Sequence, residues 1–253
     1  MYDQIAPDYD RFNNWQNRLS AELPFIQRAL EAQPKSVDVL DAACGTGMHA
    51  LGLAKLGFKV SGADLSRSMI GQARTNAQIE GVDLRFEAAG FGNLASTFGA
   101  GSFDALLCLG NSLPHVTSQD ELQETLADFS RCLRSGGKLL LQNRNFDAIM
   151  AFRQRWMEPQ SFSDNWHEWL FTRFYDFESD GLIRFNMATF KRPLGGEWKA
   201  SITSTKLMPQ LRADMTQALT KAGFHSILSF GDMNGSVFDP PKSPNLVLLA
   251  FNN

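Results

Sequence analysis

Val39-Leu-Asp-Ala-Ala-Cys-Gly-Thr-Gly47 is the stretch that decides the fold. Its apolar start predicts a buried strand over residues 37–43, its glycines predict a tight turn, and residues 48–56 predict a helix. Gly45 and Gly47 would leave no Cβ to collide with a bound ligand. A helix start also directs backbone N–H groups and partial positive charge towards such a ligand. The stretch therefore predicts a small-ligand site at the end of the first strand.

A second acidic residue follows the next strand. Residues 58–63 predict that strand, and Asp64 comes directly after it. In nucleotide-binding α/β folds an acid at this point lies beside a ribose, and its two oxygens can accept both hydroxyl hydrogens. Asp41 ends the first strand in the same way, so both acids are expected at one edge of the sheet.

Two classes of cofactor use this geometry. Gly45-Thr-Gly47-Met-His-Ala50 is close to the G-x-G-x-x-G turn of nicotinamide enzymes. However, the Asp41 carboxylate would repel a pyrophosphate, whereas it suits the ammonium and sulfonium groups of S-adenosylmethionine. The Asp-x-Ala-x-Gly-x-Gly run, which includes Ala43, resembles the adenosylmethionine-binding turn of class I methyltransferases. An NAD-dependent oxidoreductase is the alternative from a different class.

Composition and charge narrow the class of protein. The 253 residues are 43% hydrophobic, which suits one large domain, and the formal net charge is −3 with no long basic run. This disfavours a nucleic-acid partner, and no apolar stretch predicts a membrane span. The three cysteines are odd in number and widely spaced, which predicts reduced thiols in a cytoplasmic protein. The histidines and cysteines lack metal-ligand spacing, so we expect no metal.

Strands and helices alternate along the rest of the first half. We expect helices over residues 66–79 and 118–133, the second ended by Ser135-Gly136-Gly137, and strands over residues 83–88, 103–109 and 138–142. This alternation implies a Rossmann-like parallel sheet with helices on both faces and ligands at the carboxyl ends of the strands.

The end of the chain adds a helix over residues 209–222 and strands over residues 226–230 and 245–251. Class I methyltransferases end in this way, and their last strand is antiparallel to the others. We therefore predict an α/β fold with the seven-stranded class I methyltransferase sheet, in which residues 1–253 form a single methyltransferase domain.

The alternation breaks after the fifth strand. Residues 147–160 predict a helix, and β-type alternation with turns at Asp180-Gly181 and Gly195-Gly196 follows from Trp166 to about Thr205. We expect residues 147–205 to form an inserted antiparallel subdomain on the substrate side.

Residues 1–32 are expected to form an N-terminal lid and helix. Tyr2 and Tyr9 either pack on the domain or close over the active site, and residues 15–32 predict an amphipathic helix. Arg18 lies beside its apolar stripe. It is interpreted as a solvated helix charge or as a partner for the cofactor's carboxylate.

Substrate chemistry is expected after the fourth and fifth strands. The loop after the fourth strand is Cys108-Leu-Gly-Asn-Ser-Leu-Pro-His115. Asn111 either accepts a hydrogen bond from a substrate amine or is a turn residue at the end of the strand. His115 either forms a hydrogen bond with the backbone or contacts the cofactor's carboxylate or Tyr9. In Gln142-Asn-Arg-Asn-Phe-Asp147, Arg144 would hold a substrate carboxylate or pair with Asp147 or Asp176.

Leu109-Gly-Asn-Ser-x-x-His115 and Asn143-Arg-Asn-Phe-Asp147 together resemble the glycine and sarcosine N-methyltransferase group. The resemblance implies that Arg144 holds an amino acid's carboxylate, that Asn111 contacts its amine and that Tyr175 lines the acceptor pocket. It implies S-adenosylmethionine as cofactor and S-adenosylhomocysteine as product. The residues expected to hold the cofactor are Tyr9, Arg18, Asp41, Ala43, Gly45, Gly47, Asp64, Leu65, Met69, Leu109 and His115.

The sequence thus predicts an enzyme that N-methylates glycine, sarcosine or dimethylglycine by in-line displacement. Another small acceptor, a nicotinamide-dependent oxidoreductase and a catalytically idle cofactor-binding module are the alternatives.

Overall fold

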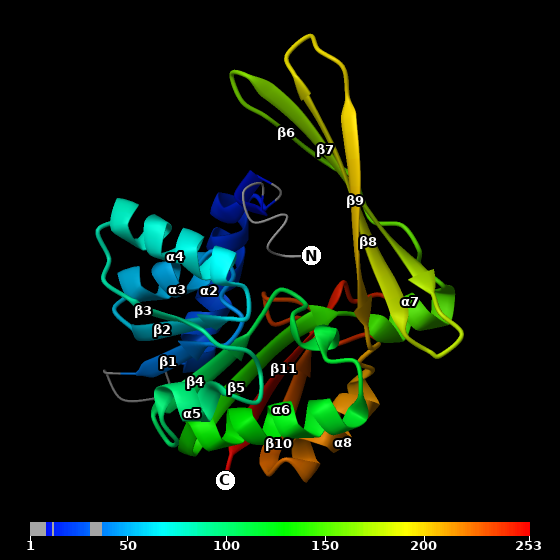
Figure 1. Ribbon diagram of the computed structural model, residues 1–253. Helices are drawn as coiled ribbons and strands as arrows, with labels where there is room; N and C mark the ends of the chain where they lie inside the picture. Colours follow the sequence, from blue (N-terminus) through cyan, green and yellow to red (C-terminus); the bar gives the residue numbers. More distant parts are fainter. Residues whose placement is uncertain (1–8, 12, 31–36) are drawn as a thin grey trace.

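The computed structural model describes residues 9–11, 13–30 and 37–253 (Figure 1). These ranges do not include Tyr2, most of the expected lid or the last residues of the helix expected over residues 15–32. The described strands form one seven-stranded and one four-stranded sheet. The larger contains β1 (Asp38–Asp41), β2 (Lys59–Asp64), β3 (Arg85–Ala88), β4 (Phe103–Cys108), β5 (Leu133–Arg144), β10 (Phe224–Phe230) and β11 (Asn245–Asn252).

The strand order of the large sheet is β10-β11-β5-β4-β1-β2-β3. Strand β1 pairs in parallel with β2 and β4, and β4 pairs in parallel with β5. Strand β11 is antiparallel to both of its neighbours. The predicted seven-stranded sheet with a reversed last strand is therefore confirmed. The order changes direction at β1, and the carboxyl ends of β1 and β4 flank this switch point, where ligands bind in such sheets.

Helices cover both faces of the sheet. On one face lie α2 (Trp15–Leu30), α3 (Met48–Lys55) and α4 (Arg67–Ile79), and on the other α5 (Leu94–Phe98), α6 (Gln119–Cys132) and α8 (Arg212–Lys221). The apolar side of each helix packs on buried sheet residues. Ser66 caps α4 as predicted, because its hydroxyl accepts the Met69 N–H at 3.1 Å.

The insert follows β5 and extends away from the large sheet (Figure 1). It begins with the helix α7 (Phe146–Phe152). Four strands follow: β6 (Gln160–Ser163), β7 (His167–Phe177), β8 (Ile183–Pro193) and β9 (Lys199–Leu207). Each strand pairs antiparallel with the next one along the chain. The antiparallel sheet is confirmed, but the predicted helix over residues 147–160 is too long. It stops at Phe152 because Arg153 is left-handed, with φ 51°, and residues 160–163 form a fourth strand.

The predicted glycine end of α6 is wrong. The helix ends at Cys132, and Gly136, with φ 73°, lies within the span of β5 beside a register shift against β4. The short helix α5 was not predicted, because residues 94–98 are too few to show a helical period. No helix within the described ranges is long and apolar enough to cross a membrane.

We expect Gly47→Ala to destabilise the protein more than Gly57→Ala. Both glycines have positive φ, 82° and 95°, so each alanine would cost about 1 kcal/mol in backbone strain. A Cβ at Gly47 would also lie 3.0 Å from Ala73 Cβ and from Phe86 Cζ, whereas at Gly57 it would meet nothing within 4 Å. Overpacking should add about 1–3 kcal/mol at Gly47. Urea unfolding measures both variants, and equal losses would contradict the packing argument.

Candidate active site

The glycine turn links β1 to α3. Gly45 and Gly47 both adopt positive φ, 53° and 82°, as a left-handed turn requires. The nearest atoms to a Cβ on Gly47 belong to Ala73 and Phe86, so packing within the protein also requires a glycine here. A Cβ on Gly45 would lie 3.7 Å from the Tyr9 ring, which places Tyr9 beside the turn.

Asp64 ties this turn to the end of β2. Its Oδ2 accepts the Gly45 N–H at 3.0 Å, and its Oδ1 accepts the Ser66 N–H at 2.8 Å. Each carboxylate oxygen has a second lone pair. The role of this carboxylate with the cofactor's ribose stays a prediction.

Asp41 is a buried acid whose two carboxyl oxygens have no hydrogen-bond partner among the described residues. Burial, followed by the charge of Asp64, raises its pKa to about 7. A buried carboxylate that lacks a protein partner suits a cationic ligand. The sulfonium and ammonium groups of S-adenosylmethionine would supply the missing positive charge, so this end of β1 fits that cofactor.

Leu65 and Met69, two of the residues expected to hold the cofactor, differ in their surroundings. Leu65 is 81% exposed, and its Cδ1 lies 3.0 Å from the position of a Cβ on Gly90, so an apolar surface is open there. Met69 is only 1% exposed and packs in a cluster with Trp169, Phe171 and Met187 of the insert. Its side chain is thus largely covered by protein.

A cavity of about 300 Å³ lies where the ends of β4 and β5 meet α2 and the insert. Six predicted site residues line it together: Tyr9, Arg18, Asn111, His115, Arg144 and Tyr175. The remaining predicted cofactor residues do not line this cavity; they are Asp41, Ala43, Gly45, Gly47, Asp64, Leu65, Met69 and Leu109. The Leu109 side chain is buried in the core, so only its backbone could reach a ligand.

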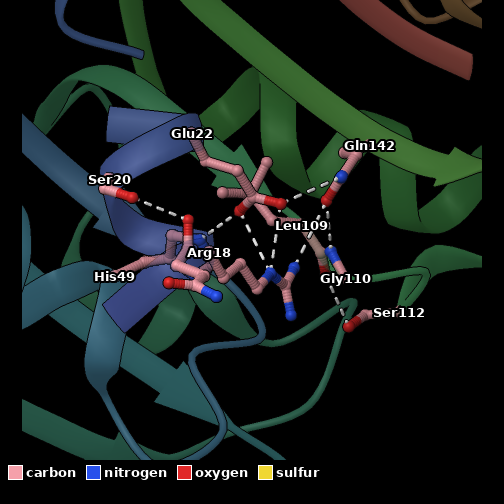
Figure 2. A network of polar contacts seen from close by, with 9 residues as sticks. Arg18, Ser20, Glu22, His49, Leu109, Gly110, Ser112 and Gln142 are labelled. Atoms are coloured by element: carbon pink, nitrogen blue, oxygen red, sulfur yellow. Dashed lines mark hydrogen bonds and ion pairs between the residues drawn. The ribbon is translucent and has the colours of Figure 1, made fainter. Parts of the chain in front are cut away.

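Arg18 is not a solvated helix charge. Its Nε lies 3.1 Å from Glu22 Oε1, and its Nη2 lies 3.5 Å from Gln142 Oε1 (Figure 2). Gln142 in turn donates to Glu22 at 3.3 Å and accepts the Gly110 N–H at 3.0 Å. The network connects helix α2 to the loop after β4, so Glu22 and Gln142 hold Arg18 in the cavity wall.

His49 completes the network from α3. Its Nε2 lies 2.6 Å from Glu22 Oε2, and burial lowers the pKa of His49, although its bond to Glu22 opposes this. Burial raises the pKa of Glu22, but the hydrogen bond from His49 and the charge of Arg18 outweigh it, so the pKa is lowered. Glu22 is therefore an anion at neutral pH, and a neutral His49 donates to it.

Asn111 is held in place by the backbone around it. It has φ 67°, its N–H donates to the Gln142 carbonyl at 3.0 Å, and its Oδ1 accepts the Arg144 N–H at 2.9 Å. Asn111 is therefore a turn residue, as one of its two interpretations predicts. One lone pair of its Oδ1, which was expected to accept from the substrate amine, is already used by the Arg144 N–H. The same bond fixes the backbone of Arg144 at the end of β5.

Neither expected protein partner pairs with Arg144. Asp147 accepts the Arg212 N–H at 3.0 Å, and Asp176 pairs with Arg155 at 2.6 Å. Within the described ranges the Arg144 guanidinium forms no ion pair, and it is exposed at the cavity. It is therefore available to an anionic ligand.

Two other titratable groups of the cavity are neutral at pH 7. Burial lowers the pKa of His115 to about 4. Burial also raises the pKa of Tyr175 to about 12, although Arg144 and Arg173 oppose the rise. These side chains can donate hydrogen bonds but add no charge.

The sequence interpretation missed several residues of the cavity wall: Glu22, Gln142, Arg173, Phe185 and Met187. Arg173 could have been found from strand period. Trp169, Phe171 and Tyr175 alternate with it on β7 and are buried, so Arg173 is the charged residue on an otherwise apolar inward face. Glu22 could not, because two of its three partners, His49 and Gln142, are distant in the sequence.

Comparisons with known proteins agree with this geometry. Residues 39–137 match the methyltransferase domain family. The chain is 29% identical over 243 residues to the glycine/sarcosine N-methyltransferase of Halorhodospira halochloris, which covers 94% of this chain and 83% of that protein. It is 32% identical to the glycine/sarcosine/dimethylglycine N-methyltransferase of Actinopolyspora halophila, covering 92% of this chain and 39% of that protein.

Solved structures support the fold. An S-adenosylmethionine-dependent methyltransferase from Clostridium acetobutylicum superposes with a TM-score of 0.79 at 20% identity, covering 100% of this chain and 99% of that one. An amino pentose methyltransferase from Micromonospora echinaspora with bound cofactor gives a TM-score of 0.69 at 20% identity, covering 98% and 95% of the two chains.

The sheet order, the glycine turn and the domain match define a class I methyltransferase, and its cofactor is S-adenosylmethionine. Within this class the sequence resembles the glycine/sarcosine N-methyltransferases.

Glu22→Gln should lower the free energy of unfolding by about 1–3 kcal/mol, because it removes a buried charge from Arg18 and His49. Glu80→Gln is the control, since Glu80 forms an exposed pair with Lys55 and its loss should cost at most about 1 kcal/mol. Thermal or urea unfolding of both variants compares them. Equal losses of unfolding free energy would show that the buried network around Glu22 stabilises the protein no more than an exposed ion pair does.

Asp41 should make cofactor affinity depend on pH. With a pKa near 7, the free protein is partly protonated at neutral pH, and a cationic ligand favours the carboxylate. Affinity for S-adenosylmethionine should therefore rise about three- to tenfold between pH 6 and pH 8, relative to S-adenosylhomocysteine, which lacks the sulfonium. Calorimetry at several pH values measures the ratio.

Asp41→Asn should remove the part of this pH dependence that the carboxylate causes. The sulfonium lowers the amino-group pKa of S-adenosylmethionine below that of S-adenosylhomocysteine, so a contribution from the amino group remains in the variant. A ratio that changes with pH equally in the wild type and in Asp41→Asn would contradict the assigned role of Asp41.

Proposed function

We propose that the protein transfers a methyl group from S-adenosylmethionine to the amine of a small amino acid, with glycine, sarcosine and dimethylglycine as the first candidates. The observation that carries the proposal is the Arg144 guanidinium, which lines the cavity without an ion-pair partner among the described residues. A carboxylate is the anion that a guanidinium can hold through two parallel hydrogen bonds. The named relatives support the same class of acceptor.

The cavity's size and charge suit such an acceptor. About 300 Å³ is at the small end of the range for ligand sites, which limits the acceptor to a small molecule. Arg144 lines the space without an ion-pair partner among the described residues, and nearby positive charge disfavours a protonated amine. The amine is therefore bound preferentially in the neutral form, whose lone pair is the nucleophile.

When bound, S-adenosylmethionine supplies a methyl group on a sulfonium that leaves readily, so the chain needs no strong catalytic base. Arg144 binds the acceptor's carboxylate, and the Asn111 side chain fixes the Arg144 backbone. Tyr175, from the insert, adds a hydroxyl and covers the acceptor from above the sheet. Arg18, held by Glu22, is available to the cofactor's carboxylate. Positioning and exclusion of water account for the catalysis.

We place this reaction in the cytoplasm. Cys44, Cys108 and Cys132 are buried free thiols, which suits a reducing compartment.

Arg144→Ala should raise the KM for the amino acid about tenfold or more, because the acceptor's carboxylate would lose a charged partner. The dissociation constant of S-adenosylhomocysteine should change little. Acceptor saturation curves and calorimetry with the product measure the two effects separately.

Arg184→Ala is the control. Like Arg144, Arg184 is exposed, but it pairs with Glu178 at 2.7 Å and does not line the cavity. It should leave the KM unchanged. An Arg144→Ala enzyme with wild-type KM for its amino acid would contradict the carboxylate assignment and favour a different small acceptor.

A further inference from the structure

The two faces of the insert sheet have different surroundings. Trp169 and Tyr175, at odd-numbered positions of β7, point into the protein, and each is 2% exposed. Successive side chains of a strand point to opposite faces, so the even-numbered residues of β7 lie on the other side of the sheet, which we call the outer face. This face points away from the cavity, on a sheet that projects past the large one (Figure 1).

The outer face is apolar over most of its length. The strand registers place Leu170 of β7 beside Phe190 of β8. Two more residues extend the face beyond the strand ends, since the Leu194 N–H donates to the Trp166 carbonyl at 2.9 Å. The large apolar residues of the outer face are Trp166, Leu170, Phe174, Phe190, Leu194, Trp198 and Ile202.

These side chains lack a hydrophobic partner layer. None of them belongs to the four hydrophobic clusters that the described residues form. Trp166 is 75% exposed and Ile202 is 65% exposed. A contiguous apolar surface open to solvent marks an interaction site on a protein.

The charged residues of the outer face are all paired within the chain. The pairs are Glu168 with Arg192, Asp176 with Arg155, Arg184 with Glu178, and Lys206 with Asp180. The face and its ion-pair partners therefore have no net charge. Such a surface does not attract the phosphates of nucleic acids or of anionic membranes, and it does not repel a second copy of itself.

The outer face is also large enough for a stable interface. Strands β7 and β8 span 11 residues each, and β9 spans 9. With about 3.4 Å per residue and about 4.8 Å between strands, the three strands cover about 500 Å². Two such faces would bury about 1,000 Å² before side-chain relief is counted, which reaches the size of a specific interface.

We propose that the outer face of the insert binds the same face of a second copy of the chain about a two-fold axis, so that the protein is a dimer in solution. The apolar residues form the centre of this interface and the ion pairs form its rim. The opposite face of β7 and β8 lines the cavity, so the partner copy holds from behind the strands that carry Tyr175 and Met187. The inference does not depend on which acceptor is methylated.

The test is the molar mass of the full chain, from light scattering and sedimentation over a range of concentrations. We expect the wild type to have twice the chain mass of 28.2 kDa. Ile202→Lys should raise the dissociation constant of the dimer about 100-fold or more, because the two-fold axis brings two unpaired charges into the interface. Ile79→Lys is the matched control, since Ile79 is 76% exposed on α4, and it should change nothing.

Trp166→Ser is a second variant of the outer face, and it should weaken the dimer by the loss of a large aromatic contact. Binding of S-adenosylhomocysteine shows that each variant is folded. A wild type with the mass of one chain at every concentration would overturn the inference and leave the face to a different partner. A dimer that neither Ile202→Lys nor Trp166→Ser weakens, or that Ile79→Lys weakens equally, would also overturn it.

Discussion

Uncompensated positive charge in a small cavity is the constraint on which the site depends. Glu22 balances Arg18 through an ion pair of 3.1 Å and is also bonded to His49 and Gln142, whereas Arg144 forms no ion pair among the described residues. On the other side of the glycine turn the imbalance is reversed, because Asp41 is a buried acid without a hydrogen-bond partner among the described residues. A cationic methyl donor and an anionic acceptor would correct both imbalances at once.

The fold brings these charges together through the parallel sheet. The ends of β1, β4 and β5 meet at one edge, so Asp41, Asn111 and Arg144 lie near one another although they are far apart in the sequence. Backbone hydrogen bonds then fix the details, since Asp64 holds Gly45 and Ser66, and Asn111 holds Arg144. The insert closes the space with one face of β7 and β8.

Much of this arrangement could be predicted from the sequence. The glycine turn, the alternation of strands and helices and the reversed last strand carry local signals, and Ser66 was recognised as a cap from its position alone. Arg144 was recognised because it follows a buried strand. Features that depend on distant partners were not predicted. The Glu22 network joins residues up to 124 positions apart, and the start of β6 has no alternation strong enough to end the helix predicted before it.

The central claim is that the cavity binds an amino acid and presents its amine for methylation. The most direct test is formation of S-adenosylhomocysteine by the purified protein, with glycine, sarcosine and dimethylglycine offered separately beside a reaction without acceptor. Turnover above that background with at least one of the three is the predicted result. Background rates with all three, from a protein that binds S-adenosylhomocysteine tightly, would contradict the claim while leaving the fold and the cofactor in place.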